Sequence, residues 1–472
     1  MPRPAPPPDR PDHPTPLEAL GDSAFSRVAE ASQSDGNAVR PLCDAAANYP
    51  AWLGAIAEAR LTVHLENYII AEDGVGRAFS AALIAATRRG VRCRVLYDWL
   101  GCWTKTSARF WTTLRTAGVE VRRYNPPRLG NPLAWISRDH RKLLCVDGRM
   151  AFVGGLCISH DWEGIPPRRD TAVEVRGPAV AHLEAAFRDS WATAAPPIAA
   201  EDPTRPDDTA RPGALSVWVI AGHPNDMGLY RLEQLIAEIV ERSLWLADAY
   251  FVATTGYVRA LSGAARAGVD VRLLVPGSSN WPIVGTLSRA GYRPLLEAGV
   301  RVFEWNGPMM HAKTAVADGC WTRVGSSNSN FASWISNREL DVTIKDRAFA
   351  KEMEAQYEQD LGNATEIALG PGRGRPTDLE NVVSPWRTAH ASRLVAGVVG
   401  LGNIVGATVS QHRTPGPAEA IVLSAAAAAL LALSLAAFLT PHLIAFALGA
   451  IAAWVGVTIL VRAWKLRPGP RP

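Results

Sequence analysis

The sequence has few cysteines, and none of them is spaced for a metal site or a redox motif. The 472-residue chain contains six, at positions 43, 93, 102, 145, 157 and 320, without a Cys-x-x-Cys pair. Zinc and redox motifs use such closely spaced thiols, and disulfide-stabilised secreted domains are short and rich in cysteine. We therefore expect reduced thiols in a cytoplasmic compartment, and no metal or other cofactor.

The chain also lacks a large excess of charge of either sign. Its 49 basic and 45 acidic side chains leave a net charge of +4, and 48% of its residues are hydrophobic. Nucleic-acid-binding proteins carry a strongly basic surface, and disordered chains are much less apolar. The composition therefore predicts two or three globular domains and no nucleic-acid partner.

The first residues differ from the rest in composition. Eight of the first sixteen are proline, and no apolar run of signal-peptide length follows them. We therefore expect a disordered, proline-rich tail over residues 1–40 and no secretory signal.

The other end of the chain is strongly apolar. Residues 421–461 contain one ionisable side chain, His442, and Thr440-Pro441-His442 divides them into two long apolar runs. Each run is long enough, at ~1.5 Å per residue, to span roughly 29 Å, close to the thickness of a bilayer core. The pattern predicts a transmembrane helical hairpin over 418–463, although a buried hairpin of a soluble core would share this composition.

The flanking charges predict how such a hairpin would be oriented. Arginines and lysines occur before and after it, including in the basic tail 464–472, whereas the short turn between the runs has none. Because positively charged flanks remain on the cytoplasmic side, we expect a multi-pass protein of the cell (inner) membrane with residues 1–415 in the cytoplasm. Leu394–Val409 is too short and glycine-rich to span a bilayer and is interpreted as an interfacial segment.

The region between the two ends repeats itself. An apolar strand pattern, a helix pattern and a second strand pattern follow one another at 61–70, 79–87 and 92–97, and again at 244–252, 258–266 and 271–275. Alternating strands and helices predict an α/β fold. We predict one domain over 41–195, a polar linker over 196–213, a second domain over 214–369, and a further linker with the interfacial segment over 370–417.

Each copy continues into the same spaced motif. The first contains His140, Lys142 and Asp147, followed by Gly154-Gly155, and the second contains His311, Lys313 and Asp318, followed by Gly325-Ser326 and Asn328. Residues two apart on a strand share a face, so each histidine and its lysine should project together. A single motif of this kind would usually be structural, but two in register indicate a function.

The residues around the motifs predict how each half could bind a phosphate. Asp147-Gly148 and Asp318-Gly319 are typical of hairpin turns, so a second strand should return toward the glycines. Small residues there would let backbone N–H groups approach an anion. Two such halves, meeting face to face, would place two histidines on opposite sides of one phosphate.

With these motifs the chain resembles the phospholipase D superfamily, whose signature is a duplicated His-x-Lys-x4-Asp followed by Gly-Gly/Ser. The resemblance covers about residues 45–365 and implies two tandem α-β-α sandwich domains related by a pseudo-two-fold axis. Further phrases are similar to bacterial cardiolipin synthases: Asp139-His140-Arg141-Lys142, Val153-Gly154-Gly155, Arg169-Asp170-Thr171, Gly177-Pro178-Ala179-Val180, Ala249-Tyr250-Phe251 and Asn337-Arg338-Glu339-Leu340.

The resemblance implies a membrane-anchored phosphatidyltransferase that needs no metal. One histidine, by family pattern His140, would attack the lipid phosphorus to form a phosphohistidine, while His311 would protonate the leaving alcohol. A hydroxyl of phosphatidylglycerol would then accept the phosphatidyl group, giving cardiolipin. The remaining implied site residues hold the phosphate (Lys142, Lys313, Asn328, Ser326, Gly154, Gly155, Gly325), orient the histidines (Asp170, Glu339) or complete the catalytic motif by pinning its hairpins (Asp147, Asp318).

Two features depart from the family pattern and leave alternatives open. Cys157 occupies a position where the family usually has asparagine, and a thiol is a poor hydrogen-bond donor, so Ser159 is a candidate substitute. The apolar hairpin is C-terminal, whereas many cardiolipin synthases carry theirs at the N-terminus. A hydrolase releasing phosphatidic acid, a membrane-tethered nuclease and a non-catalytic lipid-binding module are the competing functions.

Several other side chains have both a functional and a structural interpretation. Aromatic and methionine side chains near the motifs either line an acyl-chain groove or belong to the core: Trp99, Trp103, Trp111, Trp305, Met309 and Met310. His64, which lies in an apolar strand and has no lysine partner, is expected to be a core residue.

Overall fold

The computed structural model describes residues 13–127, 137–194, 196–198, 211–278, 285, 288–289, 291–369 and 428. The chain divides into two compact units, one of residues 1–126 and 137–388 and one of residues 127–136 and 389–472. All helices and strands named below belong to the first unit.

The first half of this unit alternates strands with helices. Its strands are β1 (Ser32–Cys43), β2 (Thr62–Asn67), β3 (Arg92–Asp98), β4 (Glu120–Tyr124), β5 (Lys142–Val146), β6 (Met150–Gly154) and β7 (Thr171–Arg176). Its helices are α3 (Asp44–Glu58), α4 (Gly74–Arg88), α5 (Trp99–Cys102), α6 (Ala108–Thr116) and α7 (Ala179–Ala194), with a 3₁₀ turn at His160–Trp162.

The second half follows the same order. Its strands are β8 (Leu215–Gly222), β9 (Ser243–Ala247), β10 (Asp270–Pro276), β11 (Arg301–Trp305), β12 (Thr314–Ala317), β13 (Trp321–Gly325), β14 (Glu339–Lys345) and β15 (Ala364–Ile367). Its helices are α8 (Gly228–Ile239), α9 (Thr255–Arg266), α11 (Tyr292–Glu297) and α12 (Arg347–Leu361), with a π-helical turn at Ala332–Ser336. The predicted α/β fold with two similar regions is confirmed.

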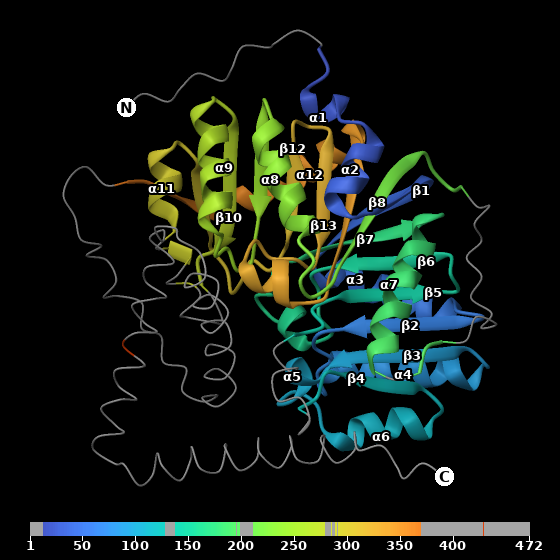
Figure 1. Cartoon of the computed structure of the whole chain (residues 1–472). Coiled ribbons are helices and arrows are strands. Elements are labelled where there is room, and N and C mark those ends of the chain that lie inside the picture. The colour runs from blue at the N-terminus through green and yellow to red at the C-terminus, as the bar shows by residue number, and fades with distance from the viewer. Residues whose placement is uncertain are drawn as a thin grey trace, which may run out of the picture. The chain divides into compact units, whose positions relative to one another are not determined.

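The described strands form one sheet in the order β15-β11-β10-β9-β12-β13-β14-β8-β1-β7-β6-β5-β2-β3-β4. Outward from the central β1–β8 pair, the first half has the order β1-β7-β6-β5-β2-β3-β4 and the second half has the order β8-β14-β13-β12-β9-β10-β11. Corresponding strands therefore take the same positions in the two halves, and only the edge strand β15 has no counterpart among the described strands. The β1–β8 pair is antiparallel, and it joins the two halves edge to edge (Figure 1). The sequence duplication therefore produces a topological duplication about the middle of the sheet.

Strand β1 belongs to both halves. Its first residues pair with β8, its last residues, Ala38–Cys43, pair with β7, and the register shifts between Ser34 and Asn37. The prediction of a disordered tail over 1–40 is therefore wrong for residues 16–40, which also contain α1 (Pro16–Ala19) and α2 (Asp22–Ala29). A capping box between Thr15 and Glu18 begins α1, and Leu17 and Phe25 are buried in the core of the second half.

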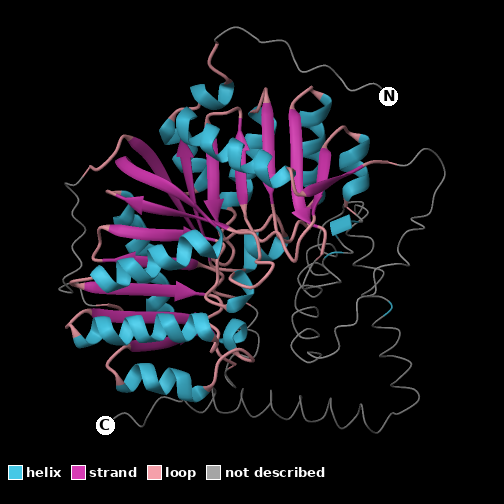
Figure 2. Cartoon of the chain, turned by 180° about the vertical axis from the view of Figure 1, so that it is seen from behind, coloured by secondary structure: helices cyan, strands magenta, loops and turns pink. Residues whose placement is uncertain are grey.

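Helices cover both faces of the strands and enclose separate cores. In the first half, Trp52 of α3, Phe79 of α4 and Phe110 of α6 share one core, which lies against the face opposite α7 (Figures 1 and 2). A central core contains residues from both halves, including Phe187 of α7 and Phe349 of α12. Because this central core is shared, neither half buries its apolar surface alone.

Both motif aspartates form the predicted hairpin turns. Asp147 and Gly148 have φ angles of 53° and 64°, and Asp318 and Gly319 have φ angles of 49° and 62°. Two successive residues with positive φ make the tight turn that suits antiparallel strands, here β5–β6 and β12–β13.

Several predicted segments lie outside the described residues. These are the linker 370–417 with its interfacial segment, the basic tail 464–472, most of the linker 196–213, and the predicted hairpin 418–463 except for residue 428. Among the helices of the described residues, none combines the length and apolar character that crossing a membrane would require.

Candidate active site

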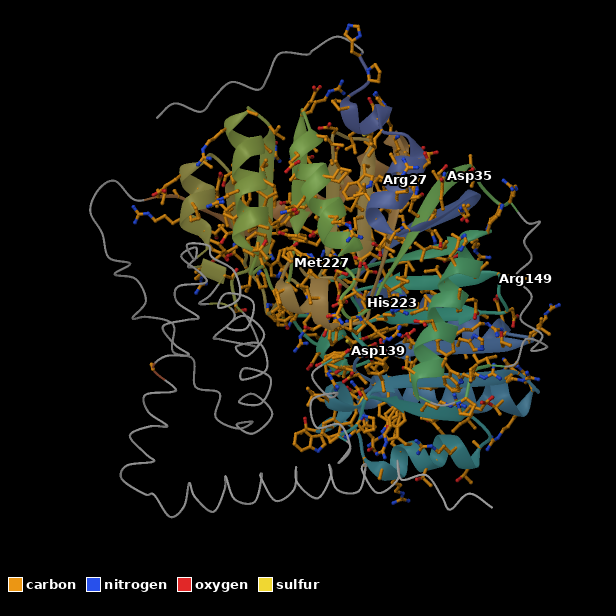
Figure 3. The ribbon with its side chains drawn as sticks, viewed as in Figure 1. Arg27, Asp35, Asp139, Arg149, His223 and Met227 are labelled. Atoms are coloured by element: carbon orange, nitrogen blue, oxygen red, sulfur yellow. The ribbon has the colours of Figure 1, made fainter. Side chains whose placement is uncertain are left out.

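Both histidine motifs lie where their strands begin. His140 lies two residues before the start of β5 at Lys142, and His311 lies three residues before the start of β12 at Thr314. The sequence predicted each histidine within a strand, whereas in the structure each lies two or three residues before its strand begins. In Figure 3, Asp139 lies where the two halves meet, whereas Arg149, beside the β5–β6 turn, lies at the other end of the strands.

Each histidine is held by backbone from the opposite half. The N–H of His140 donates to the carbonyl of Arg338 at 2.9 Å, and the N–H of His311 donates to the carbonyl of Arg169 at 2.7 Å. These contacts belong to two short parallel bridges, Asp139 with Arg338 and Arg169 with Met310. The site is therefore built by exchange of segments between the halves.

The residue that follows each of these arginines is a carboxylate, and it orients the histidine that the arginine carbonyl holds. Nδ1 of His140 lies 2.9 Å from Oε2 of Glu339, and Nδ1 of His311 lies 2.7 Å from Oδ2 of Asp170. An ionised carboxylate can only accept, so in each pair Nδ1 carries the proton. This leaves Nε2 of each ring as the atom that can attack or protonate a substrate.

The two carboxylates are themselves held by hydrogen bonds. Ser326 donates its hydroxyl to Oε2 of Glu339 at 2.6 Å, and Asn337 donates its amide to Oε1 at 3.3 Å. Trp162 donates its indole N–H to Oδ2 of Asp170 at 2.8 Å. Such partners fix the rotamer of a carboxylate and, through it, the plane of the imidazole.

The electrostatics of the two histidines differ. Burial lowers the pKa of His140, while the charge of Glu339 acts in the opposite direction. Burial lowers the pKa of His311 further, and the charges of Lys313 and Lys142 add to that effect. Of the two histidines, His140 therefore keeps its proton to the higher pH.

The two carboxylates also differ. Burial alone would raise the pKa of Glu339, but the charge of His140 and its hydrogen bond lower it below the ordinary value. The pKa of Asp170 is raised, chiefly by burial, although Lys313 and several hydrogen-bond donors oppose this. Glu339 is therefore the more firmly ionised of the two carboxylates.

The two motif lysines are fully buried beside the histidines. Each ammonium group donates to the carbonyl oxygen of the histidine two residues earlier in its own motif. Burial lowers the pKa of Lys142, and it lowers the pKa of Lys313 to about 8. Two buried ammonium groups beside the histidines can stabilise the negative charge of a phosphate group.

Aromatic rings line both half-sites, and the sequence did not assign them a role. Tyr68 is edge-on to His140 with ring centroids 5.1 Å apart, and Tyr250 is edge-on to His311 at 6.1 Å. Trp162 is edge-on to His311 at 5.2 Å. The recurrence of a tyrosine just after β2 and just after β9 is the signal that could have identified the first two.

The glycines have a different role from the predicted one. The N–H groups of Gly155 and Gly325 donate to the carbonyls of Thr171 and Lys313, so neither is available to an anion. A Cβ atom at Gly155 would lie 2.2 Å from Oδ1 of Asp170, and one at Gly154 would lie 2.5 Å from Cα of Ala172. These glycines let β7 and its orienting carboxylate lie close to β6.

Two other residues predicted to bind phosphate, Ser326 and Asn328, differ in whether their side chains are already hydrogen-bonded. The hydroxyl of Ser326 is committed to Glu339, and its N–H donates to Leu340. The side-chain Oδ1 of Asn328, in contrast, is buried and accepts no hydrogen bond. Because this oxygen and a phosphate oxygen both accept, any contact of Asn328 with a phosphate would come from its side-chain NH₂ group.

The motif aspartates lie at the turn end of the strands. Asp147 accepts from the backbone N–H groups of Arg60, Leu61 and Thr62 at 2.7–2.9 Å. Asp318 accepts in the same way from three consecutive N–H groups that begin at Glu241. Each aspartate thus ties its hairpin to the start of the neighbouring strand, β2 or β9.

Cys157 is buried in the first half-site, and its suggested substitute is occupied elsewhere. Burial raises the pKa of the Cys157 thiol, although the charge of Lys142 opposes this. The hydroxyl of Ser159 contacts Oδ2 of Asp73 at 3.2 Å and accepts from the N–H of Asp161. Ser159 is therefore engaged in the following turn and does not replace a phosphate-binding amide.

The aromatic and methionine side chains near the motifs differ in their exposure to solvent. Trp111, Met309 and Met310 are buried, as core residues are, whereas Trp103 is exposed. His64 is buried, stacks on Phe187 and lies 2.6 Å from Glu184, which confirms it as a core residue. Within the described residues, no group of three or more His, Cys, Asp or Glu side chains is arranged to hold a metal ion.

Comparison with known proteins agrees with this geometry. The model of the family described as "Cardiolipin synthase, PLD-like domain" matches twice, over residues 53–191 and 235–361. A cardiolipin synthase of Geobacillus sp. (strain WCH70) is 31% identical over 386 residues, 80% of this chain and 76% of that protein. Cardiolipin synthase B of Escherichia coli (strain K12) is 34% identical over 337 residues, 67% of this chain and 79% of that protein.

A solved structure shares the fold. Phosphatidylserine synthase from Haemophilus influenzae Rd KW20 superimposes with a TM-score of 0.56 at 14% identity, covering 73% of this chain and 92% of that one. At this identity the similarity shows the fold alone.

Proposed function

Because the chain belongs to the cardiolipin synthase family with phospholipase D-like domains, we propose that it transfers a phosphatidyl group to a hydroxyl of phosphatidylglycerol. Family membership makes it a phosphatidyltransferase of the phospholipase D superfamily. The observation that carries the proposal is the exchange between halves, in which each histidine is oriented by a carboxylate of the other half beside two buried lysines.

In the first step, Nε2 of His140 attacks the phosphorus of the donor lipid and forms a P–N bond. The bond from phosphorus to the oxygen of the glycerol headgroup breaks, and Nε2–H of His311 supplies the proton to that oxygen. The attack makes the His140 ring cationic, and the ionised Glu339 at its Nδ1–H stabilises that charge. Lys142 and Lys313 stabilise the negative charge on the phosphoryl oxygens.

In the second step, Nε2 of His311 removes the proton from the acceptor hydroxyl. The acceptor oxygen attacks phosphorus, the P–N bond breaks, and His140 returns to its initial state. His311 must therefore gain a proton before the first step, although burial and the lysine charges lower its pKa in the free protein. The negative charge of a bound phosphate offsets those lysine charges, so substrate binding and protonation of His311 favour each other.

The test is lipid analysis of two variants with purified full-length protein and phosphatidylglycerol. We expect cardiolipin and free glycerol from the wild type, and no cardiolipin and no more than one glycerol per protein from His140→Ala or His311→Ala. His311→Ala should accumulate an acid-labile phosphatidyl group on His140, detectable with labelled donor. Phosphatidic acid as the main product would instead indicate a hydrolase, and substantial turnover by either variant would exclude the two-histidine mechanism.

We further propose that residues 418–463 anchor the protein in the inner membrane with its catalytic halves in the cytoplasm. The apolar composition of this segment and its basic flanks support the proposal. A chain that ends near Gly416 should leave the membrane fraction on a carbonate wash, whereas the full chain should not. Labelling of engineered cysteines by a membrane-impermeant reagent on the periplasmic side of intact cells would contradict the orientation.

A further inference from the structure

Two large apolar side chains are exposed near the site. Among the described residues, the large hydrophobic side chains that are exposed are Leu61, Trp103, Ile165 and Leu369. Ile165 is 102% exposed and Trp103 is 49% exposed, and Trp103 stacks on Trp99 with ring centroids 5.2 Å apart. Trp99 and Trp103 belong to α5 and its C-terminal end (Figure 1), and Ile165 belongs to the loop between the 3₁₀ turn and β7.

Two cations belong to the same two segments of the chain as these apolar side chains. Lys105 lies 3.7 Å from Oδ2 of Asp161, and Arg168 lies 3.1 Å from the same oxygen. One carboxylate cannot neutralise both side chains, so this cluster keeps a net positive charge. The contact through Asp161 also joins the segment after α5 to the loop that carries Ile165.

The same loop leads directly to the catalytic histidine. The Arg168 guanidinium lies 4.7 Å from the ring centroid of Trp162, whose ring is edge-on to His311 at 5.2 Å. Trp162 also donates to Asp170, which orients His311. The charge of Arg168 is among those that lower the pKa of His311. The loop that carries Ile165 and Arg168 therefore borders the second half-site.

We propose that Trp99, Trp103, Lys105, Ile165 and Arg168, here called the docking rim, contact the surface of a bilayer that contains anionic lipid. Tryptophan rings favour the level of the lipid headgroups, and a projecting aliphatic side chain is stabilised by the acyl region below them. Lysine and arginine beside them are attracted to anionic headgroups. This proposal rests on the proposed function, because a lipid phosphate must reach His140 and His311 from a bilayer.

The position of the docking rim gives the membrane a specific role in the reaction. The rim holds the histidine end of the strands at headgroup level, and the turn ends with Asp147 and Asp318 point away from it. Leu61, immediately before β2, is 44% exposed and donates its N–H to Asp147 at the turn end. The chain thus provides a matched control residue, because Leu61 is exposed and apolar but should not contact lipid.

The test places an environment-sensitive fluorophore at each position in the full-length protein. Ile165→Cys and Leu61→Cys are labelled, and labelled wild type, in which Cys43 is half-buried, gives the background. On vesicles of phosphatidylcholine with phosphatidylglycerol, the label at 165 should shift to shorter emission wavelength and be quenched by acyl-brominated lipid. The label at 61 should do neither. The label reports its local environment, so an anchor elsewhere in the chain does not produce the signal.

Activity supplies the second measurement. Ile165→Ser should lower turnover of phosphatidylglycerol in vesicles about tenfold while leaving turnover of a monomeric short-chain phosphodiester within twofold. Leu61→Ser should change neither rate. Equal signals at positions 165 and 61, or no signal at 165 while cardiolipin is formed, would overturn the docking rim. A lipid-dependent signal at 165 without phosphatidyl transfer from any donor would instead contradict the proposed function and leave the rim in place.

Discussion

Replacement of Glu339 by glutamine tests whether the exchanged carboxylates act through the histidines. The glutamine carbonyl can still accept from Nδ1 of His140, 2.9–3.0 Å away in the wild type, but its charge is gone. A hydrogen bond to a charged group contributes about 1.5–3 kcal/mol and a neutral one about 0.5–1.5 kcal/mol. The difference of about 1–1.5 kcal/mol predicts a 5- to 15-fold loss of kcat/KM, at ~1.36 kcal/mol per tenfold.

The pH profile provides the more specific evidence. Glu339 acts to raise the pKa of His140, so removal of its charge lowers that pKa. His311 has the more strongly lowered pKa, and the alkaline limb of kcat/KM therefore belongs to His140, whichever histidine is the nucleophile. We expect Glu339→Gln to move the alkaline limb to lower pH. Asp170→Asn, the matched variant in the other half-site, should leave that limb in place.

The assay is the initial rate of phosphatidyl transfer from short-chain phosphatidylglycerol between about pH 5 and pH 9, the range in which a histidine with an ordinary pKa of ~6.5 titrates. Thermal unfolding of each variant serves as the control for folding. Glu339→Ala removes the acceptor as well as the charge, and the full value of the charged bond predicts a loss of about 10- to 150-fold. A Glu339→Gln protein with wild-type rate and an unmoved alkaline limb would refute the reasoning.

Three further predictions concern the hairpin turns, the first half-site and the association of the two halves. Asp147→Asn and Asp318→Asn should each lower the free energy of unfolding by about 1–3 kcal/mol, measured by chemical denaturation, because each loses a charged acceptor of three backbone N–H groups. Their kcat at a temperature where they are folded should remain within about threefold of wild type, and a loss comparable to that of His140→Ala would show a direct catalytic role. Cys157→Asn should leave the transfer rate unchanged or raise it, because it adds an amide beside Lys142, and a loss of more than about tenfold, with Cys157→Ser active, would show that this core has no room for the amide. After protease cleavage at a site introduced within 199–210, the two fragments should elute together in size-exclusion chromatography and remain active. The reason is that the β1–β8 pair and the shared core hold the halves together. Separation of the fragments under native conditions would contradict that account.

The features that the sequence predicted correctly depend on neighbours along the chain. The Asp-Gly turns follow from residues that tolerate positive φ, and strands β3 and β10 follow from apolar runs bounded by turn residues. The motifs are recognised because each is a short, spaced phrase that occurs twice. These signals are local, so one sequence is enough to predict the α/β class, the duplication and the histidine and lysine side chains of the candidate site.

Other features depend on contacts between distant segments. Strand β1 has no regular alternation of apolar residues, and it forms because β7 and β8 offer backbone hydrogen bonds on either side of it. The roles of Gly154 and Gly155 could not be assigned correctly, because a glycine that admits a neighbouring strand and one that binds an anion look the same in sequence. Only the folded chain distinguishes a free backbone N–H from one already paired.

The sequence by itself identified the histidines and lysines of the candidate site, and the tertiary structure decided how they are paired. Family pattern alone drew attention to Glu339 and Asp170, which lie 199 and 141 positions from the histidines they orient. No local rule assigns Glu339 to His140 and Asp170 to His311, because that assignment depends on how the halves join. The antiparallel β1–β8 pair turns one half against the other and brings the segment before β14 to His140 and the segment before β7 to His311.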